Sequence, residues 1–376
     1  MYCRSTAYRD PTSAFFDARR AYLTRYSAHR LREAEAYIAT LEHGKKTETS
    51  PGEQTLCLGI ATVARRDHQY VRSTVGSLFA GLSENERNKI FFNFFIAHVD
   101  PSTHPVFGEK WLDALPDRLL EYPHEGSDRD QIQIWEEGGW YRNKSIYDYK
   151  YLLRDCYETK APYIAIIEDD TLAVGDWFRR LLDALEIVQK KTEEQFPGQN
   201  WIYLRLFYSD NLLGWNSEDW PTYLFWSFVA WSSISAAMLG LRRHFPRKLE
   251  YMTTGVMAAI SLVCVPAPTV LFFLAGKQSM MPISPGIQLM AKYGCCSQGF
   301  VYPRTVIPQV INQVRLETKG LVDMQIERVA DQGQYMRWAV VPPLLQHIGA
   351  TSSKGYGFDD IARQIWNFRY ELYSGV

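Results

Sequence analysis

Three consecutive acidic residues, Glu168, Asp169 and Asp170, directly follow an apolar run at residues 161–167. Three buried carboxylates are costly in free energy unless a cation or basic side chains accompany them. Carboxylate oxygens suit magnesium or manganese rather than zinc, and such a cation commonly joins one or two carboxylates to a substrate's phosphates. Because alternate residues of an extended segment share a face, Glu168 and Asp170 would act together while Asp169 points elsewhere. The alternative is an exposed acidic turn before a helix, with Asp176 as its N-cap.

Two residues late in the chain have side chains suited to the same chemistry. Asp323 opens a predicted helix, where its carboxylate could take a proton from an attacking hydroxyl group. Its other role would be that of a helix N-cap, and the two roles do not exclude each other. His347 follows the last predicted strand, and an imidazole can complete a manganese coordination sphere; a structural histidine is the alternative. The predicted metal ligands are therefore Glu168, Asp170 and His347.

The elements that would position these side chains alternate between short apolar runs and amphipathic segments. Apolar runs of strand length are typical of buried strands, and apolar residues at helical spacing are typical of helices packed on a sheet. Ligands of open α/β sheets bind beyond the carboxyl ends of the strands, where the acidic triplet would emerge. We therefore predict an α/β fold with helices on both faces of the sheet. The predicted strands are residues 55–63, 89–99, 161–167 and 201–207, and the predicted helices are residues 71–82, 147–157 and 176–191.

The chain on either side of this alternation has a different character. Residues 12–42 carry apolar side chains at roughly helical spacing and are predicted to form one helix, either a stalk or an outer helix. The polar residues 44–53 indicate a flexible link. Near the other end, Gly, Pro and Cys in residues 282–308 indicate loops with short strands. A helix at residues 323–332, then a strand and turn at residues 338–346, would complete the domain.

Two uncharged stretches interrupt the predicted domain, at residues 221–241 and 251–276. Each is long enough to cross a hydrocarbon core, which needs about 20 residues of helix. The basic residues 242–248 between them are typical of a short loop on the cytoplasmic side of a membrane. We predict a transmembrane hairpin, whose second span would be kinked by Pro266 and Pro268. The alternative is a pair of buried core helices in a soluble protein.

The net charge bears on which partners the chain can bind, and the N-terminal residues bear on how it enters its compartment. The formal net charge is -1, and no long block of Lys or Arg is present, so we predict no nucleic-acid partner. Residues 1–10 are polar and lack the apolar core of a signal peptide. Either the chain enters its compartment by other means, or an N-terminal anchor is missing from this sequence.

The six cysteines are too few for a disulfide scaffold in a chain of 376 residues. Cys57 and Cys264 lie in apolar runs and are predicted to be buried free thiols. Cys295 and Cys296 are adjacent, so a distant partner such as Cys156 is more plausible for them than each other. No Cys and His pattern has the spacing of a zinc site.

Three segments together resemble a known family. Residues 58–78 (LGIATVARRDHQYVRSTVGSL), 163–178 (YIAIIEDDTLAVGDWF) and 340–355 (VVPPLLQHIGATSSKG) are similar to GT-A-type glycosyltransferases related to N-acetylglucosaminyltransferase IV. The inserted hairpin narrows the resemblance to the Golgi GPI N-acetylgalactosaminyltransferase family, whose GT-A domain is interrupted by tandem transmembrane helices. The resemblance extends over about residues 56–355.

This resemblance implies a GT-A-type, Rossmann-like domain and an inverting, manganese-dependent transferase. The donor would be UDP-N-acetylgalactosamine and the acceptor the first mannose of the GPI glycan. The enzyme would lie in the Golgi membrane with its catalytic domain in the lumen. The domains would be an N-terminal helical or stalk segment, the donor side of the GT-A domain, the hairpin, and the acceptor side. Their bounds are residues 1–54, 55–220, 221–277 and 278–376.

The resemblance also implies site residues for the donor and its cation. Glu168, Asp169 and Asp170 take the role normally given to an Asp-x-Asp sequence, and the leading Glu departs from that pattern. Asp170 and Asp323 are the implied catalytic residues. The predicted hairpin also favours a GPI glycan as the acceptor, because a membrane hairpin would raise the effective concentration of a lipid-anchored glycan.

The uridine of the donor would be held by Thr62, Val63 and Arg65, at the end of the first strand. Lys144 and its two preceding residues, Arg142 and Asn143, could approach the nucleotide; simple surface charge is the alternative for all three. Residues 143–145 also form an N-glycosylation sequon.

Two other functions remain open for this sequence. The chain could be another Golgi UDP-sugar transferase that extends N-glycans or lipid-linked glycans. It could also be an inactive GT-A-like membrane scaffold. Donor hydrolysis would separate a catalyst from a scaffold, and a panel of acceptors would separate the two enzymes.

Overall fold

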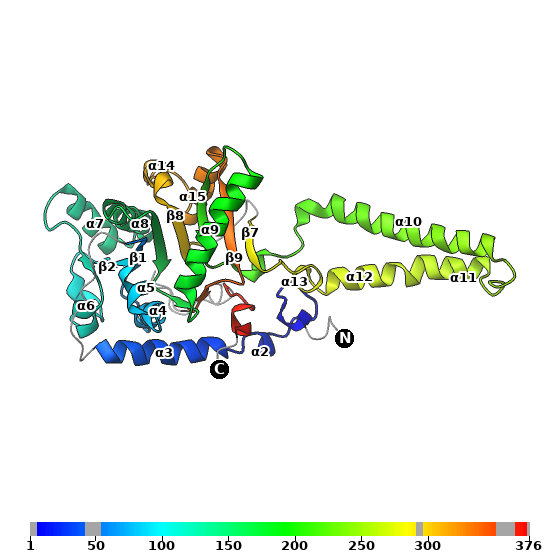
Figure 1. Cartoon of the computed structure of the whole chain (residues 1–376), viewed down its shortest axis with the longest axis horizontal. Coiled ribbons are helices and arrows are strands. Elements are labelled where there is room, and N and C mark those ends of the chain that lie inside the picture. The colour runs from blue at the N-terminus through cyan, green and yellow to red at the C-terminus, as the bar shows by residue number, and fades with distance from the viewer. Residues whose placement is uncertain (1–5, 42–53, 291–295, 351–364, 374–376) are drawn as a thin grey trace. The chain divides into compact units, whose positions relative to one another are not determined.

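A computed structural model describes residues 6–41, 54–290, 296–350 and 365–373. These residues divide into two compact units. In Figure 1 the larger unit carries the sheet and the helices around it, and the smaller unit carries the long helices of the predicted hairpin. The larger unit spans residues 24–209 and 284–376, and the smaller unit spans residues 1–23 and 210–283.

The larger unit is built on an eight-stranded sheet with the strand order β3-β2-β1-β4-β8-β6-β9-β7. The strands β3, β2, β1 and β4 are parallel, β8 is antiparallel to both its neighbours, β6 and β9 are parallel, and β7 is an antiparallel edge strand. A separate antiparallel pair joins β5 to β10. The predicted α/β fold is confirmed as a mixed, mostly parallel sheet. The strands are β1 (Leu56–Thr62), β2 (Ile90–Ile96), β3 (Arg118–Leu120), β4 (Tyr163–Glu168), β5 (Thr171–Ala173), β6 (Trp201–Arg205), β7 (Gly286–Leu289), β8 (Gly299–Pro303), β9 (Met336–Val341) and β10 (Leu345–His347).

Helices cover both faces of this sheet, as predicted (Figure 1). The side chains of β1 alternate between the two faces: Leu56, Leu58 and Ile60 pack into one apolar core and Cys57 into the other. The first core includes residues of α3, α4, α6 and α9, and the second includes residues of α7, α8, α14 and α15. The helices are α3 (Tyr26–Leu41), α4 (Val71–Phe79), α5 (Glu84–Asn88), α6 (Lys110–Ala114), α7 (Ser127–Glu137), α8 (Tyr141–Glu158), α9 (Trp177–Gln195), α14 (Ile307–Gln313) and α15 (Val322–Gln332).

Close packing of α3 on α4 fixes the start of the larger unit. A Cβ atom at Gly76 would lie 2.4 Å from the backbone oxygen of Ala34, so only glycine allows the two helices to approach this closely. The buried guanidinium of Arg30 donates hydrogen bonds to the carbonyl oxygens of Ala173 and Ser77. The helix α3 is therefore anchored both to α4 and to β5, the strand that follows the acidic triplet.

The prediction of one helix over residues 12–42 is wrong. The structure contains a short helix, α2 (Ala18–Ala21), and then α3, with a break between them. The boundary between the two units falls at Leu23, so the two helices belong to different units. The side chain of Asp17 caps α2 by accepting a hydrogen bond from the backbone of Arg19. The predicted link at residues 44–53 lies outside the described residues.

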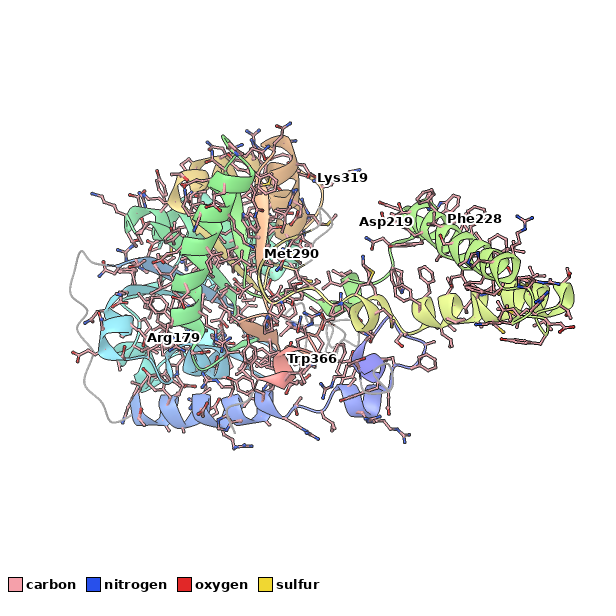
Figure 2. The ribbon with its side chains drawn as sticks, turned by 45° about the vertical axis from the view of Figure 1, so that its right-hand side comes forward. Arg179, Asp219, Phe228, Met290, Lys319 and Trp366 are labelled. Carbon is pink, nitrogen blue, oxygen red and sulfur yellow. A yellow bond between two sulfur atoms is a disulfide. The ribbon has the colours of Figure 1, made fainter. Side chains whose placement is uncertain are left out.

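The two predicted spans are both helical. The first is α10 (Trp220–His244), and the second consists of α11 (Thr254–Ala259), a π-helical turn at Ile260–Cys264, and α12 (Pro266–Leu274). By length and composition both are able to cross a membrane. Only 0% and 6% of their most apolar segments are buried, so the alternative of buried core helices is wrong. Figure 2 shows their side chains projecting outward, that of Phe228 among them.

The middle of the hairpin is held together by polar groups at the π-helical turn. The Trp231 indole donates a hydrogen bond of 2.8 Å to the backbone oxygen of Ser261. The hydroxyl groups of Ser235 and Ser261 lie 2.7 Å apart. The turn ends at Cys264, two residues before Pro266, which lacks an N–H group, so a π-helical turn interrupts the second span next to the predicted kink.

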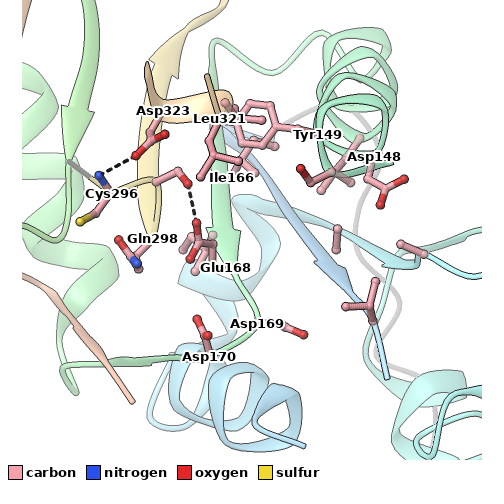
Figure 3. A pocket seen from close by; sticks show the side chains of 18 of the residues that line it. Asp148, Tyr149, Ile166, Glu168, Asp169, Asp170, Cys296, Gln298, Leu321 and Asp323 are labelled. Atoms are coloured by element: carbon pink, nitrogen blue, oxygen red, sulfur yellow. Dashed lines mark hydrogen bonds between the residues drawn. The ribbon is translucent and has the colours of Figure 1, made fainter. Parts of the chain in front are cut away.

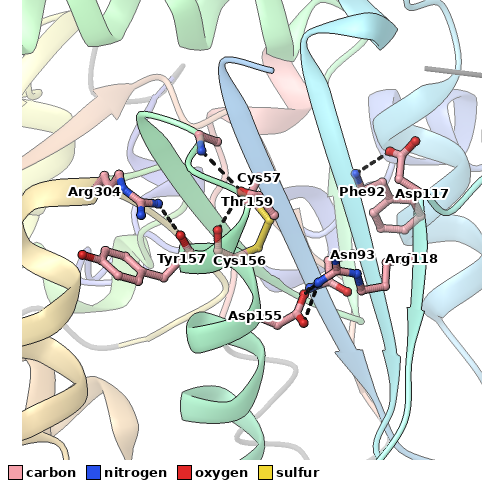
Figure 4. The surroundings of a disulfide bond; sticks show 11 residues. Cys57, Phe92, Asn93, Asp117, Arg118, Asp155, Cys156, Tyr157, Thr159 and Arg304 are labelled. Carbon is pink, nitrogen blue, oxygen red and sulfur yellow. Dashed lines mark hydrogen bonds and ion pairs between the residues drawn. A yellow bond between two sulfur atoms is a disulfide. The ribbon is translucent and has the colours of Figure 1, made fainter. Parts of the chain in front are cut away.

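The cysteine predictions are partly wrong. Cys57 is not a free thiol but forms a disulfide with Cys156, which joins β1 to α8 (Figure 4). Cys156 is therefore not the partner of Cys295 or Cys296. The pairing arises because β1 turns Cys57 toward the face that α8 covers, with 5.6 Å between the two Cα atoms. Cys264 is free, as predicted, but it is exposed on the hairpin rather than buried.

The remaining differences concern short elements. The strands β3 and β5 and the helices α7 and α14 were not predicted, because each is short or lacks a clear apolar period. The single strand predicted at residues 338–346 is two strands, β9 and β10, separated by Pro342 and Pro343. The chain reverses there so that β10 can pair with β5 and not with the main sheet.

Candidate active site

A pocket of about 510 Å³ opens at the carboxyl ends of β1, β2 and β4 (Figure 3). It is lined by Ala61 from β1, Ala97 after β2, and Glu168 at the end of β4, and Ala61 and Glu168 are register partners in the sheet. The opposite end of the pocket is formed by residues 296–298 and by the start of α15. In parallel sheets of this type the carboxyl edge is where ligands bind.

The acidic triplet is held by hydrogen bonds from α4. The buried hydroxyl of Thr74 contacts the carbonyl oxygens of Asp169 and Thr171, each at 2.8 Å, and accepts a hydrogen bond from the backbone N–H of Thr171. The pairing of β5 with β10 holds the segment that follows. The three acidic side chains therefore leave a fixed turn between β4 and β5.

Asp169 forms a buried ion pair with Arg65. Its two carboxylate oxygens accept hydrogen bonds from the two terminal nitrogens of Arg65, both at 2.7 Å, and one also accepts from the Thr62 hydroxyl at 2.6 Å. Burial lowers the pKa of Arg65, but Asp169 and Asp170 outweigh it and hold that pKa above its usual value. His104 lies 3.1 Å from the Thr62 hydroxyl. Thr62 and Arg65 thus hold Asp169 in place.

Glu168 and Asp170 line the pocket with different electrostatic surroundings. Burial and the nearby Asp170 raise the pKa of Glu168, whose carboxylate accepts a hydrogen bond from the Ser297 hydroxyl. Burial opposes ionisation of Asp170 as well, but His347 and Arg65 outweigh it and lower the pKa of Asp170. One Asp170 oxygen, Oδ1, is buried and has no hydrogen-bond partner among the described residues. A buried carboxylate oxygen with no protein partner is suited to a cation.

His347 contacts Asp170 but does not line the pocket. Its Nε2 lies 3.5 Å from Asp170 Oδ2, and its Nδ1 lies 3.1 Å from the backbone oxygen of Ile365. A Cβ atom at Gly349 would lie 2.3 Å from Asp170 Oδ2 and 2.9 Å from His347 Nε2, so this glycine leaves room for the pair. Burial lowers the pKa of His347, but Asp170 and Glu168 raise it above its usual value.

The predicted ligands Glu168, Asp170 and His347 do not form a three-ligand metal site. Within the described part of the chain, no three His, Cys, Asp or Glu side chains converge closely enough for one. Magnesium and manganese bound with phosphates need fewer protein ligands, because phosphate oxygens and water fill the remaining positions. The carboxylates of Glu168 and Asp170 line the pocket, and within the described part of the chain Asp170 Oδ1 has no hydrogen-bond partner, which fits this arrangement. Metal-bound histidines commonly donate their other ring nitrogen to a carbonyl, as His347 is placed to do.

Asp323 lines the opposite end of the pocket, in the first turn of α15. Its Oδ2 accepts a hydrogen bond of 3.1 Å from the backbone N–H of Cys296. The alternative of an N-cap is wrong, because the N-cap residue is Leu321 and its side chain makes no capping bond. Sequence reasoning missed what supports α15: the fully buried Arg205 donates to Glu327, one turn beyond Asp323, and to the Cys296 carbonyl, at 2.6 and 2.8 Å.

A second buried network borders the end of the pocket near α8. Asp148, which the sequence analysis did not identify, lines the pocket and accepts hydrogen bonds from the Tyr122 hydroxyl and from Lys144 Nζ at 3.1 Å. Lys144 also donates to Tyr122 and to the Ala97 carbonyl. Burial raises the pKa of Asp148, although Lys144 opposes this. The i, i+4 spacing of the two residues on a helix was the signal available in the sequence.

The structure brings together some of the predicted site residues but not all of them. The predicted residues that line the pocket are Val63, Arg65, Glu168, Asp169, Asp170 and Asp323. Thr62, Lys144 and His347 lie behind its wall, bonded to Asp169, Asp148 and Asp170 respectively. Arg142 is more than a surface charge, because its guanidinium donates to the carbonyl oxygens of residues 316, 318 and 320, ahead of α15.

A family model described as GPI-N-acetylgalactosamine transferase PGAP4 matches residues 56–346 of this chain. No curated protein matches the chain at a significant level. The match begins at β1, includes the pocket carboxylates and Asp323, and ends in β10, one residue before His347. It confirms the family resemblance and the prediction that the chain is an enzyme. Because the match covers most of its length, the chain belongs to the GPI-N-acetylgalactosamine transferase PGAP4 family and is a glycosyltransferase.

Proposed function

We propose that this chain transfers N-acetylgalactosamine from UDP-N-acetylgalactosamine to the first mannose of a GPI-anchor glycan, through a GT-A-type catalytic domain. Membership of the family supports a GPI-directed transferase. The observation that carries the site assignment is one pocket with carboxylates in three places. Glu168 and Asp170 lie at the carboxyl edge of the sheet, with Asp148 on α8 and Asp323 at the start of α15.

The donor nucleoside fits the end of the pocket near β1 and α8. That end is lined by Ala61, Val63, Ala97 and Leu152, which offer apolar contact to a nucleobase and ribose. Asp148 is a fixed acceptor there, and a uracil ring presents one N–H donor between two carbonyl groups. In this orientation the diphosphate reaches the acidic turn, and the sugar lies toward Asp323.

Glu168 and Asp170 are the residues that would hold a divalent cation, which we propose to be manganese. When bound with the donor, such a cation neutralises the charge that develops on the diphosphate as the glycosidic bond breaks. The chain's own contribution is to hold the two carboxylates on one side of the turn. Arg65 helps by binding Asp169 and Asp170, which draws Asp169 away from the pocket centre.

Asp323 is the proposed general base for an inverting displacement. The acceptor mannose hydroxyl attacks the anomeric carbon of the donor from the side opposite the diphosphate. The new carbon–oxygen bond forms as the bond to the diphosphate breaks, and the hydroxyl proton passes to Asp323. UDP leaves with the electron pair of the broken bond. The Cys296 N–H and the Arg205–Glu327 pair fix the position of Asp323 for this step.

The two long apolar helices support a membrane-bound enzyme that acts on a lipid-anchored acceptor. We propose that the hairpin spans the Golgi membrane and that the larger unit lies in the lumen. Tethering the catalytic unit to the membrane that holds the acceptor restricts both to one surface. This raises the effective concentration of the acceptor without any added contact.

Titration calorimetry with purified full-length protein tests the donor site. UDP-N-acetylgalactosamine, UDP and CDP are each titrated with and without manganese into wild-type protein, Asp170→Asn and Asp148→Ala. We expect manganese-dependent binding by the wild type, loss of that dependence in Asp170→Asn, and loss of discrimination between UDP and CDP in Asp148→Ala. Binding of UDP by Asp170→Asn with undiminished manganese dependence would contradict the assignment of this carboxylate.

A further inference from the structure

The hairpin contains an apolar cavity of about 670 Å³ that the transfer reaction does not use. It lies between the first half of α10 and the end of α12, and all its lining residues belong to the smaller unit. Aromatic rings from both helices form most of the wall, with small residues between them. Its lining includes Trp215, Tyr223, Ala230 and Phe273.

The cavity is fixed at both ends. At its inner end the Trp231 indole and the Ser235 hydroxyl bind Ser261, which joins the two helices at that level. At its outer end the Trp215 indole donates a hydrogen bond of 3.0 Å to the backbone oxygen of Phe273. The Trp215 ring also packs against Tyr223, with 5.2 Å between ring centroids. The space between these two ties is therefore part of the folded hairpin.

Within a membrane, we expect a hydrocarbon chain to fill this cavity. Its wall offers few polar groups to hold water, and water is excluded from the hydrocarbon core. An empty space of this size would forfeit the dispersion contacts of every ring that lines it. The cavity is continuous with the outward-facing apolar surface of the two helices, whose apolar segments are almost wholly exposed. Lipid chains are the apolar molecules available at that surface.

The position of the cavity along the chain selects one leaflet. Both ends of the hairpin continue in sequence into the larger unit, at residues 209–210 and 283–284. The cavity lies at this end, away from the basic loop that joins the helices. It therefore lies in the leaflet next to the catalytic unit. A lipid-anchored glycan that this unit can reach has its own chains in that same leaflet.

We propose that this cavity binds a hydrocarbon chain of the acceptor's own lipid, so that the hairpin recognises the acceptor as well as anchoring the enzyme. This inference rests on the proposed function. The glycan is then bound at two points, its mannose at the active site and its lipid at the hairpin. Binding at both points fixes the reach of the glycan from the membrane and lowers the KM for lipid-bearing acceptors.

The test compares two acceptors with the full-length enzyme in detergent micelles: an intact GPI glycolipid, and the same glycan after its lipid has been cleaved off. Ala230→Trp fills the cavity, and Ala237→Trp places the same side chain at an exposed position of α10 outside it. We expect Ala230→Trp to raise the KM for the glycolipid by about tenfold, the loss of roughly two buried methylene groups. Its kcat/KM for the lipid-free glycan should match wild type, and Ala237→Trp should change neither acceptor.

Two results would overturn the inference. One is an equal effect of Ala230→Trp on both acceptors. The other is an unchanged KM for the glycolipid while native mass spectrometry shows that Ala230→Trp has lost bound phospholipid, because the cavity would then hold bulk lipid.

A binding measurement separates this inference from the proposed function. An acceptor glycolipid with a photoreactive diazirine in its chain should crosslink to residues 215–281 in wild type but not in Ala230→Trp. If the enzyme transfers no sugar but this crosslink forms, the proposed function fails and the lipid site stands. If sugar is transferred and no crosslink forms at the hairpin, the lipid site fails alone.

Discussion

Asp169 and Asp170 are adjacent in sequence, but their contacts give them different roles. Asp169 is bound by Arg65 and Thr62, while one buried oxygen of Asp170 has no partner in the part of the chain that the structure describes. The sequence analysis expected this division from strand alternation alone. It did not identify Arg65 as the partner of Asp169, because the two residues are 104 positions apart and no local pattern joins them.

The two neighbouring carboxylates should therefore respond differently to the same substitution. Asp170→Asn should abolish metal-dependent transfer with little change in melting temperature. Asp169→Asn leaves the buried Arg65 without its main counter-charge and should cost about 3–5 kcal/mol of stability. Thermal unfolding and steady-state kinetics on both variants measure the difference. The assignment fails if Asp169→Asn is as stable as wild type while Asp170→Asn unfolds.

Gly349 provides a check on the Asp170–His347 pair that leaves both side chains intact. The methyl group of Gly349→Ala would collide with Asp170 Oδ2 and press on His347 Nε2. Displacing a residue that orients a metal ligand typically costs about 10–100-fold in activity or metal affinity, and we expect a loss of that size. The control is Gly240→Ala, because nothing lies within 4 Å of a Cβ atom at that position. Equal activity of the two variants would show that the pair is not needed.

Among the elements, β1, β4 and α8 each contribute residues to the pocket wall, and the sequence predicted all three. Their apolar runs have the length and spacing typical of a buried strand or helix. The disulfide between β1 and α8 was not predicted, since Cys57 in an apolar strand is indistinguishable by sequence from a buried thiol. For the same reason, nothing in the sequence revealed that Arg205 and Glu327 meet across 122 residues behind Asp323.

The Cys57–Cys156 disulfide should stabilise the larger unit substantially. Closing a loop of 99 residues is expected to contribute about 4.7 kcal/mol through the entropy of the unfolded chain. The double variant Cys57→Ala, Cys156→Ala should therefore unfold at a markedly lower temperature than wild type under oxidising conditions. Cys264→Ala is the matched control, because this cysteine is free and exposed. A melting temperature equal to that of the control would mean that the disulfide adds no stability.

Along the whole chain, the larger unit is interrupted in sequence by a pair of long apolar helices. The sequence predicted the two helices because each uncharged stretch is long enough to cross a hydrocarbon core. It did not predict that the N-terminal residues would divide between the two units, since the break after α2 has no Gly or Pro to mark it. A single polar capping residue, Asp17, is the only local sign of that short helix.

The proposed orientation places the loop between the spans in the cytosol and the larger unit in the Golgi lumen. In cells whose plasma membrane alone is permeabilised, an impermeant maleimide should label Lys248→Cys in the loop. Glu84→Cys, exposed on α5, should be labelled only after the Golgi membrane is dissolved. Both variants are made in a Cys264→Ser background. Labelling of Glu84→Cys before the Golgi membrane is dissolved would contradict the luminal assignment.

The most direct measurement is transfer to a purified GPI glycolipid. Wild-type protein and Asp323→Asn are each incubated with isotopically labelled UDP-N-acetylgalactosamine, manganese and the acceptor. Mass spectrometry then detects any sugar added to the first mannose. We expect one labelled N-acetylhexosamine there, with kcat reduced about 10²–10⁴-fold in Asp323→Asn and donor KM unchanged. A folded wild-type protein that adds no sugar to this mannose, or an Asp323→Asn variant as fast as wild type, would contradict the account.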